Sequence, residues 1–292
     1  MQGKLVPGSS LIFGCGYVGR QVARRLADLD AGPVYGVTRS TDKAQQLAAT
    51  GVQAIVADWT DRRSLSKLPR CDRVLVAVSY DPASRLSRYE SQVGGLGNLL
   101  DVLPAETDLV YLSTTGVYHQ SDGGWVDETS PARPQSAGGL AHLQAEQLLH
   151  RRRPAAAWGV LRLAGLYGPG RIPRLGDIVA GRPLGAADGY LNLIHRDDAA
   201  EAVLAAWQRP GDRLRMYLVA DDQPLPRRRF YQQIARLTGG EEPQFSDQGP
   251  PRSPRSASNK RVWNRRMRHH LLPRMQYPNC IQGLTAILKS LR

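Results

Sequence analysis

The chain of 292 residues has no long hydrophobic run, three cysteines and very little lysine. No apolar run approaches the roughly 18 residues that span a bilayer, and the N-terminus lacks the charged and then apolar pattern of a secretory leader. We therefore expect a cytoplasmic protein without membrane contact. Cys15, Cys71 and Cys280 fit no zinc-ligand spacing and cannot all pair within one chain. These absences argue against a disulfide-stabilised module and against a zinc domain.

Acidic residues are missing from positions 248–292, which carry ten lysines or arginines. The first 247 residues are close to neutral, so the formal net charge of +13 comes mostly from this terminal segment. Arginines with an interleaved tryptophan could suit a nucleic acid, and the candidates are Arg252, Arg255, Lys260, Arg261, Trp263, Arg265, Arg266 and Arg268. A basic stretch is as easily a solvated face or a contact for a substrate phosphate, so we do not expect nucleic-acid binding.

A glycine-rich turn near the N-terminus is the most informative feature that is present. The apolar segment 11–13 runs into Gly14, Gly16, Tyr17, Val18 and Gly19, and helical spacing of Val18, Val22, Leu26 and Leu29 follows. In such a strand–turn–helix unit the first glycine permits a tight turn, the second lets the backbone approach a pyrophosphate, and the third lets the helix pack on the strand. The helix N-terminus then points N–H groups at the phosphates. The turn predicts a dinucleotide site.

Short apolar strands alternate with helices through the first half of the chain. Strands are expected at 34–38, 54–56, 74–78, 109–112 and 158–161, and helices at 43–49, 88–103 and 140–152. This alternation predicts an α/β fold with a doubly wound parallel sheet of the Rossmann type. The apolar stripe at Val93, Leu96, Leu99, Leu100 and Leu103 is expected to be core rather than an interface.

The pattern loosens after Pro169, where we expect a helix at 197–207, a strand at 216–219 and a helix at 229–238. We predict a dinucleotide-binding domain over 1–168, with strand contributions continuing to about 220. A smaller α/β substrate-binding region over 169–292 would cap the carboxyl ends of the strands. The stretch 248–258, rich in proline, serine and arginine, reads as a loop or linker.

The end of the second predicted strand indicates which dinucleotide is bound. An NAD-selective site would place an acidic residue there, about 20 residues past the glycines, to bond the ribose hydroxyls. This chain has Arg39 and Ser40 instead. A guanidinium suits a 2′-phosphate, so NADP(H) is predicted in preference to NAD(H). The alternatives are that Arg39 is an ordinary surface arginine and that Arg20 is the phosphate contact.

Several later segments together resemble the extended short-chain dehydrogenase/reductase superfamily, in particular its NAD(P)-dependent nucleotide-sugar epimerase/dehydratase branch and atypical relatives. The similar segments, in chain order, are Ala57–Asp61, Gly94–Leu100, Leu112–Tyr118, Trp125–Glu128, Arg162–Arg171 and Ile194–Asp198. The resemblance implies that Asp58 bonds the adenine amino group beside Trp59 and that Ala77 and Val78 line the cofactor. It makes Thr114 the catalytic hydroxyl, which would polarise a substrate hydroxyl or carbonyl; the alternative is a strand-end hydroxyl that satisfies local backbone.

The chain departs from that family at its central tyrosine and lysine, which are four residues apart. Gly138 stands where the tyrosine belongs and His142 where the lysine belongs, and no slipped alignment supplies the pair. Loss of such an acid–base pair removes about two to four orders of magnitude of rate. His142 could act as acid or base or hold the ribose, or it could be a partly exposed helix histidine. Tyr80, with Asp81, is a further catalytic candidate. His195 is expected to order the loop at the start of its helix.

Two functions remain open from the sequence. The first is an atypical NADP(H)-dependent oxidoreductase or epimerase acting on a hydroxylated, anionic, nucleotide-sugar-like small molecule, with Arg162, Arg171 and Arg174 lining the substrate pocket. The second is a non-catalytic NADP(H)-binding sensor or scaffold, which the missing pair favours. The family resemblance also implies a possible homodimer through the helices at 88–103 and 140–152.

Overall fold

The computed structural model describes residues 5–185, 187–209, 214–245 and 258–290. The chain divides into two compact units that interleave along the sequence. The first unit comprises Met1–Thr114, Ala137–Arg162 and Ala200–Tyr217, and the second comprises Thr115–Ser136, Leu163–Ala199 and Leu218–Arg292. These units do not follow a single boundary after residue 168, because residues 115–136 belong to the second unit and residues 137–162 to the first.

A seven-stranded parallel sheet organises the first unit, in the order β11-β7-β5-β4-β1-β2-β3. Its strands are β1 (Ser10–Phe13), β2 (Val34–Thr38), β3 (Gln53–Val56), β4 (Arg73–Val76), β5 (Asp108–Thr114), β7 (Trp158–Leu163) and β11 (Met216–Val219). Strands covered by helices on both faces read as continuous apolar runs, which explains why they were recognisable in the sequence. The predicted Rossmann-type α/β fold is confirmed.

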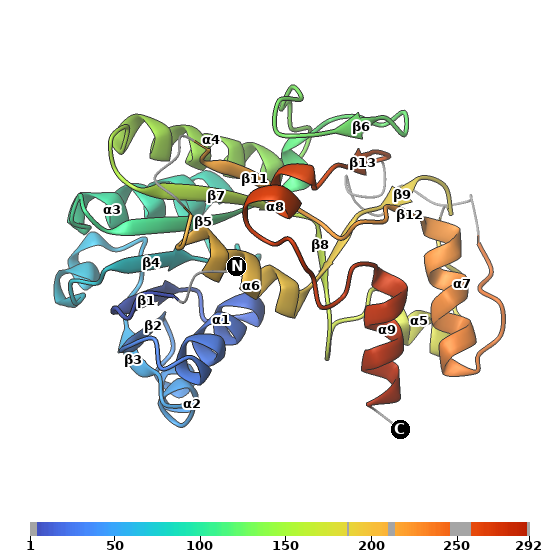
Figure 1. Cartoon of the computed structure of the whole chain (residues 1–292), viewed down its shortest axis with the longest axis horizontal. Helices are drawn as coiled ribbons and strands as arrows, with labels where there is room; N and C mark the ends of the chain where they lie inside the picture. Colours follow the sequence, from blue (N-terminus) through green and yellow to red (C-terminus); the bar gives the residue numbers. More distant parts are fainter. Residues whose placement is uncertain (1–4, 186, 210–213, 246–257, 291–292) are drawn as a thin grey trace. The chain divides into compact units, whose positions relative to one another are not determined.

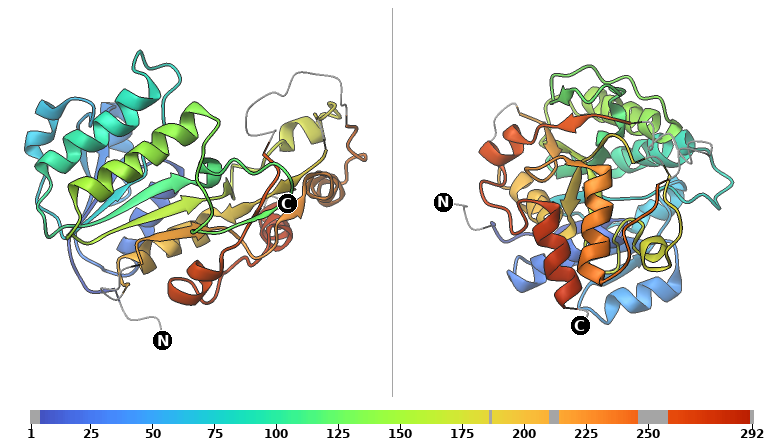
Figure 2. Two further views of the ribbon diagram at one scale, coloured as in Figure 1. Left: turned by 90° about the horizontal axis from the view of Figure 1, so that it is seen from above. Right: turned by 90° about the vertical axis from the view of Figure 1, so that its right-hand side faces the viewer.

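Helices cover both faces of this sheet. They are α1 (Tyr17–Asp28), α2 (Thr41–Ala48), α3 (Gly95–Val102), α4 (Ala137–Arg152) and α6 (Arg196–Ala206), with short helical turns at η1 (Arg62–Lys67) and η3 (Thr115–Val117). Figures 1 and 2 show α3 and α4 side by side on one face, with α1 on the other. The helix predicted over 88–103 begins with a π-helical turn, η2 (Glu90–Gly94). Leu29, predicted on the buried face of α1, lies just past its end and is 50% exposed.

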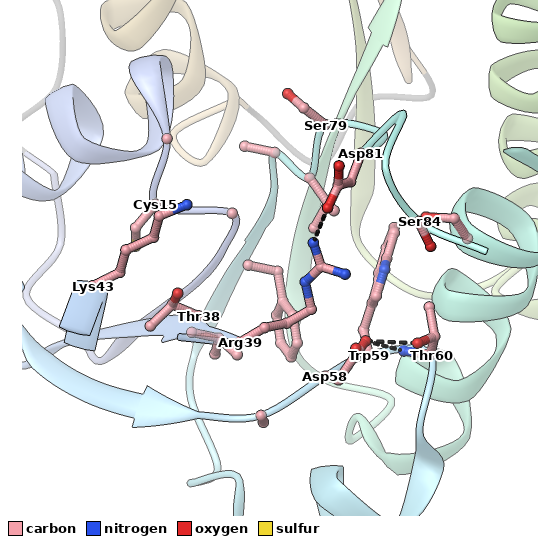
Figure 3. A pocket seen from close by; sticks show the side chains of 18 of the residues that line it. Cys15, Thr38, Arg39, Lys43, Asp58, Trp59, Thr60, Ser79, Asp81 and Ser84 are labelled. Carbon is pink, nitrogen blue, oxygen red and sulfur yellow. Dashed lines mark hydrogen bonds and ion pairs between the residues drawn. The ribbon is translucent and has the colours of Figure 1, made fainter. Parts of the chain in front are cut away.

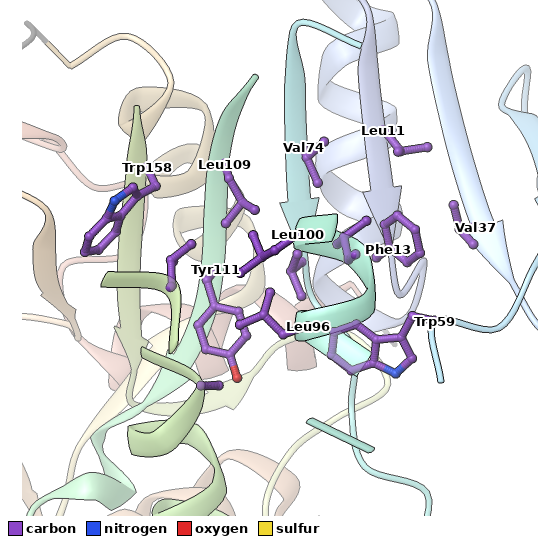
Figure 4. Packing of buried hydrophobic residues seen from close by; sticks show 14 of the residues in the cluster. Leu11, Phe13, Val37, Trp59, Val74, Leu96, Leu100, Leu109, Tyr111 and Trp158 are labelled. Carbon is purple, nitrogen blue, oxygen red and sulfur yellow. The ribbon is translucent and has the colours of Figure 1, made fainter. Parts of the chain in front are cut away.

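The core of the first unit lies between the sheet and α3 with α4. Figure 4 shows Leu96 and Leu100 of α3 pointing toward Tyr111, Leu109 and Val74 of the sheet. The expectation that the stripe at 93–103 is core is confirmed, since Leu96 and Leu99 have no exposed surface.

Short paired strands and four helices make up the described part of the second unit. Its parallel pairs are β8 (Gly165–Tyr167) with β10 (Leu193–His195) and β6 (Trp125–Val126) with β13 (Arg261–Val262), and β9 (Tyr190–Leu191) pairs antiparallel with β12 (Leu225–Pro226). The helices are α5 (Leu175–Val179), α7 (Arg227–Thr238), α8 (Arg265–His270) and α9 (Cys280–Lys289). A separate core forms around Tyr167, Phe230, Ile234, Leu284 and Ile287.

Candidate functional site

The order of the sheet reverses between β1 and β4, and this is where an open α/β sheet binds ligands, beyond the carboxyl ends of its strands. Gly14 follows β1 at this edge with a φ of +86°, a conformation that favours glycine. A Cβ at this position would lie 2.5 Å from the carbonyl oxygen of Ala77, which follows β4. The first glycine therefore serves both a turn and a close approach between neighbouring strand ends.

The other two glycines of the turn have opposite surroundings. A Cβ on Gly19 would lie 2.3 Å from the carbonyl oxygen of Gly14, so this glycine lets α1 pack on the turn. A Cβ on Gly16 would meet nothing within 4 Å. Gly16 is also the N-cap of α1, no side chain caps this end, and its first turn holds no acidic residue. An open glycine before an uncapped helix end fits a dinucleotide pyrophosphate, which brings its own negative charge.

A pocket of about 240 Å³ opens at this edge of the first unit. Figure 3 shows its side chains converging from the ends of β1, β2, β3 and β4. Of the residues predicted to bind the cofactor, it is lined by Gly14, Gly16, Arg39, Asp58, Trp59, Ala77 and Val78, and the alternative phosphate contact Arg20 is also there. Residues far apart in the sequence thus meet in one cavity.

The segment after β3 forms one wall of the pocket. The carboxylate of Asp58 accepts hydrogen bonds from the backbone N–H (2.9 Å) and the hydroxyl (2.7 Å) of Thr60, which fixes its orientation. The indole of Trp59 packs on Gly95, where a Cβ would come within 2.6 Å of the ring. Asn98 donates a hydrogen bond from its side-chain amide to the Trp59 carbonyl oxygen at 3.0 Å. The glycine-rich segment at 94–100 therefore holds this wall in place.

The end of β2 and the start of α2 form the corner where a 2′-phosphate is expected. Ser40 is the N-cap of α2, and its hydroxyl accepts from the backbone N–H of Lys43 at 3.3 Å. Ser40 therefore stabilises the helix start. Lys43 lines the pocket together with Arg39, a contribution that the sequence analysis missed. Its position three residues after a capping serine, on the first turn of a predicted helix, was the available signal. Arg20 donates from Nε to the carbonyl oxygen of Cys15 at 3.1 Å.

Arg39 does not face the pocket alone. Its Nη2 lies 3.0 Å from Oδ2 of Asp81, on the segment that follows β4 (Figure 3). The other carboxylate oxygen of Asp81 accepts the backbone N–H of Ala83 at 3.0 Å. These two bonds, the backbone one first, hold the pKa of Asp81 below its ordinary value, so the carboxylate stays charged at neutral pH.

The catalytic candidates Thr114 and His142 belong to β5 and α4 of the first unit. His142 is half-buried, and its Nδ1 lies 2.8 Å from the hydroxyl oxygen of Tyr111, a buried residue of β5. Burial and the nearby Glu146 charge raise the pKa of Tyr111, so the phenol keeps its proton. A protonated phenol can donate to Nδ1, and an imidazole that accepts there holds its own proton on Nε2. In that tautomer His142 offers an N–H donor from α4.

Tyr80 is engaged within its own loop. Its hydroxyl donates to the carbonyl oxygen of Leu86 at 3.0 Å, and the guanidinium of Arg88 lies 4.1 Å from its ring centre. A Cβ on Gly138 would lie 3.6 Å from Nη1 of the same arginine. Arg88 therefore borders Gly138, a contact between distant segments that no local sequence pattern predicts.

The prediction that Arg162 lines a substrate pocket is wrong. Its side chain is 4% exposed and pairs with Glu146, with Nη2 at 2.6 Å from Oε2 and Nε at 3.0 Å from Oε1. Ser113 donates its hydroxyl to the same carboxylate at 2.5 Å. The buried pair joins α4 to β7 and β5, so Arg162 stabilises the interior of the first unit.

In the second unit, Arg171 is exposed, and Nε of Arg174 lies 3.0 Å from Oδ2 of Asp177. Their role in substrate binding stays a prediction. His195 is 1% exposed and its Nδ1 accepts the backbone N–H of Asp197 at 3.2 Å, so it orders the start of α6.

The basic C-terminal segment is less available than its sequence suggests. Lys260 is 4% exposed, and its ammonium donates to the Ser258 hydroxyl (2.7 Å) and the Tyr118 carbonyl oxygen (3.3 Å). Arg266 and Arg268 pair with Glu128 and Asp222. Arg252 and Arg255 lie outside the described residues.

Two kinds of feature are absent from the described residues. No helix among them is both long and apolar enough to cross a membrane. Within the same ranges, no cluster of histidine, cysteine, aspartate or glutamate has the arrangement of a metal site.

Comparisons with known proteins agree with this geometry. The model of the NAD dependent epimerase/dehydratase family matches residues 11–220. Protein YeeZ of Escherichia coli K12 is 36% identical over 137 residues, which are 47% of this chain and 48% of YeeZ, so the match spans about half of that relative. A functionally unknown conserved protein from Silicibacter pomeroyi is 30% identical, with a TM-score of 0.80 over 97% of this chain and 99% of that one. A putative NAD-dependent epimerase/dehydratase from Methylobacillus flagellatus is also 30% identical, with a TM-score of 0.77 over 97% and 98%.

Proposed function

Because the chain belongs to the NAD-dependent epimerase/dehydratase family, we propose that its glycine turn binds NADP(H) and that it is an atypical oxidoreductase or epimerase. The arrangement of the three glycines carries this proposal. Gly14 and Gly19 are each required by a close backbone approach, whereas Gly16 faces open space at an uncapped helix end. Such a cradle suits a pyrophosphate.

The preference for NADP(H) over NAD(H) is supported by the charges at the end of β2. Arg39 and Lys43 both line the pocket at this corner, and the position following β2 carries no carboxylate for ribose hydroxyls. Arginine binds phosphate through charge-assisted hydrogen bonds, and a lysine adds a second positive charge.

A bound nicotinamide dinucleotide supplies hydride transfer. Thr114 at the end of β5 offers a hydroxyl that can polarise a substrate hydroxyl or carbonyl. The Nδ1 of His142 lies 2.8 Å from the Tyr111 hydroxyl, and we propose that this hydroxyl donates to Nδ1 and leaves Nε2 as an N–H donor toward the substrate. The substrate class we propose is a hydroxylated, anionic small molecule resembling a nucleotide sugar.

A second candidate is a non-catalytic NADP(H)-binding sensor or scaffold. The observation that favours it is the state of Gly138 and of the two acid–base candidates, Tyr80 and His142. This residue offers no side chain, the Tyr80 hydroxyl is bonded to Leu86, and the His142 Nδ1 is bonded to Tyr111. The hydroxyls of Tyr80 and Tyr111 are both engaged in these bonds, so neither is placed as the proton donor that the family's tyrosine provides.

Calorimetric titration tests the binding proposal. We expect the wild type to bind NADPH more tightly than NADH, and Arg39→Gln to weaken NADPH about tenfold because one charge-assisted contact is lost. NADH affinity should be unchanged in this variant. Arg24→Gln is the matched control, since Arg24 is an exposed arginine of α1 that does not line the pocket. Equal affinities for the two dinucleotides in the wild type would contradict the preference, and no binding of either would contradict the function.

A turnover screen separates the two candidates. NADPH- or NADP+-saturated protein should convert at least one carbonyl, alcohol or nucleotide-sugar substrate, and Thr114→Val or His142→Ala should abolish that turnover while NADPH still binds. Absence of turnover across the screen, with intact binding, would favour the sensor or scaffold.

A further inference from the structure

The ion pair between Arg39 and Asp81 lies inside the pocket, where both side chains are in the lining. The arginine side chain is 55% exposed and the aspartate 42%, so both remain accessible to a ligand in solvent. A negative charge that approaches Arg39 from the pocket meets a guanidinium already shared with a carboxylate. The pair is therefore part of the binding chemistry of this corner.

The two partners differ in how firmly they are held. Asp81 begins a turn in which its Oδ1 accepts the Ala83 N–H and its carbonyl oxygen accepts the Ser84 N–H at 3.0 Å. The carboxylate is thus fixed by the backbone. Arg39 reaches this carboxylate from the end of β2 through a long and partly exposed side chain, and one of its Nη nitrogens makes the bond. If the ion pair opens, we therefore expect the Arg39 side chain to move and the Asp81 carboxylate to stay in place.

A ribose 2′-phosphate and the Asp81 carboxylate require the same guanidinium. The phosphate carries about −1.5 to −2 charges at neutral pH and can bind an arginine through two parallel hydrogen bonds. Lys43 supplies a second positive charge to it. The phosphate can therefore displace the carboxylate, but part of its binding free energy is spent in opening the pair.

We propose that Asp81 is a specificity-determining residue that competes with the 2′-phosphate of NADP(H) for Arg39 and so limits the preference for NADP(H) over NAD(H). This inference rests on the proposed function. NADH has no 2′-phosphate and leaves the pair closed, so Asp81 affects one dinucleotide only. Asp81 balances the charge of Arg39 when NADH is bound, and it moderates selectivity when NADPH is bound.

The test is a double-mutant cycle of dinucleotide affinities measured by calorimetry at low ionic strength. Asp81→Asn preserves the Ala83 N–H bond and removes the charge. It should strengthen NADPH binding about threefold to fivefold, the range expected for an exposed ion pair, and change NADH affinity by less than about twofold. In the Arg39→Gln background the same change should have no effect on NADPH. Asp42→Asn, on the exposed first turn of α2, controls for general loss of negative charge.

Salt provides an independent readout. The gain from Asp81→Asn should shrink as ionic strength rises from about 0.01 M to 1 M, since exposed charges are screened over that range. Weaker NADPH binding in Asp81→Asn would overturn the inference, because Asp81 would then position Arg39 for the phosphate. An unchanged NADPH affinity, an equal gain for both dinucleotides, or a gain that persists in Arg39→Gln would overturn it as well. Absence of binding by wild type and variant alike would overturn the proposed function together with the inference.

Discussion

The hydroxyl oxygen of Tyr111 lies 2.8 Å from Nδ1 of His142, which joins β5 to α4. Tyr111 is 1% exposed and burial raises the pKa of its phenol, so the phenol keeps its proton and can donate to Nδ1. A phenol that donates to Nδ1 leaves Nε2 to carry the imidazole proton.

We expect the phenol to donate, so nitrogen NMR of histidine-labelled protein should show the proton of the His142 imidazole on Nε2. In Tyr111→Phe, Nδ1 loses its donor and the signal should move toward the average of two tautomers. The same variant should lower the free energy of unfolding by about 1 kcal/mol, because one buried hydrogen bond is lost. Finding the wild-type proton on Nδ1 would contradict the donor role of His142.

The buried pair of Glu146 and Arg162 should contribute strongly to stability. Arg162→Met leaves a carboxylate without its cation in a side chain that is 5% exposed, so the free energy of unfolding should fall by about 3–5 kcal/mol. The double variant Glu146→Leu, Arg162→Met should lose less than Arg162→Met alone, since no buried charge is then stranded. Urea unfolding measures both. A double variant less stable than the single one would show that the pair is intrinsically stabilising.

Acid should destabilise the protein partly through His195. Burial lowers the pKa of this imidazole from 6.5 to about 4, so the unfolded chain binds the proton more tightly than the folded one. The free energy of unfolding that the neutral His195 imidazole contributes is complete above roughly pH 6.5 and is lost as the pH falls toward 4. It amounts to at most about 3 kcal/mol. His195→Gln retains an acceptor for the Asp197 N–H. Its stability should fall less steeply over this range; a slope equal to that of the wild type would contradict the assignment.

Cys15 should react slowly despite its place in the pocket. Burial is the largest cause that raises the pKa of its thiol, to about 12, so the thiolate is scarce at neutral pH. Iodoacetamide should therefore label Cys15 far more slowly at pH 7.5 than an unfolded control, as followed by mass spectrometry of its peptide. Cys15→Ser identifies the modified site. Labelling at the unfolded rate would show that the thiol is exposed or ionised.

Much of the first unit could be predicted because its buried strands are short apolar runs and its helices repeat apolar residues at helical spacing. β2 and β11 match their predicted ranges, and the glycine turn predicted a cradle that the backbone provides. The dinucleotide pocket could be inferred from local sequence, since each wall is the end of one apolar strand. The sequence predicted Asp81 only as a catalytic candidate alongside Tyr80, not as the ion-pair partner of Arg39.

What the sequence could not supply were contacts between segments far apart in the chain. Arg162 lies in a motif that suggested an exposed anion contact, yet Glu146 on α4 makes it an interior residue. The pairing of β6 with β13 joins residues more than a hundred positions apart, and two-residue strands have too little periodicity to recognise. Arg39 follows β2 and Asp81 follows β4. These two strands flank β1 in the sheet, so their carboxyl ends lie at the same edge and the two side chains can meet.

The glycine turn offers the most direct test of dinucleotide binding through Gly16→Ala. A methyl group there meets no protein atom within 4 Å, so the variant should fold with wild-type stability, as should the control Gly176→Ala, which is equally unobstructed. Calorimetric titration with NADPH should show binding to the wild type and to the control, and loss of affinity by about tenfold or more in Gly16→Ala, because the methyl group occupies the path of the pyrophosphate. Wild-type affinity in a folded Gly16→Ala variant, or no NADPH binding by the wild type, would contradict the proposed site.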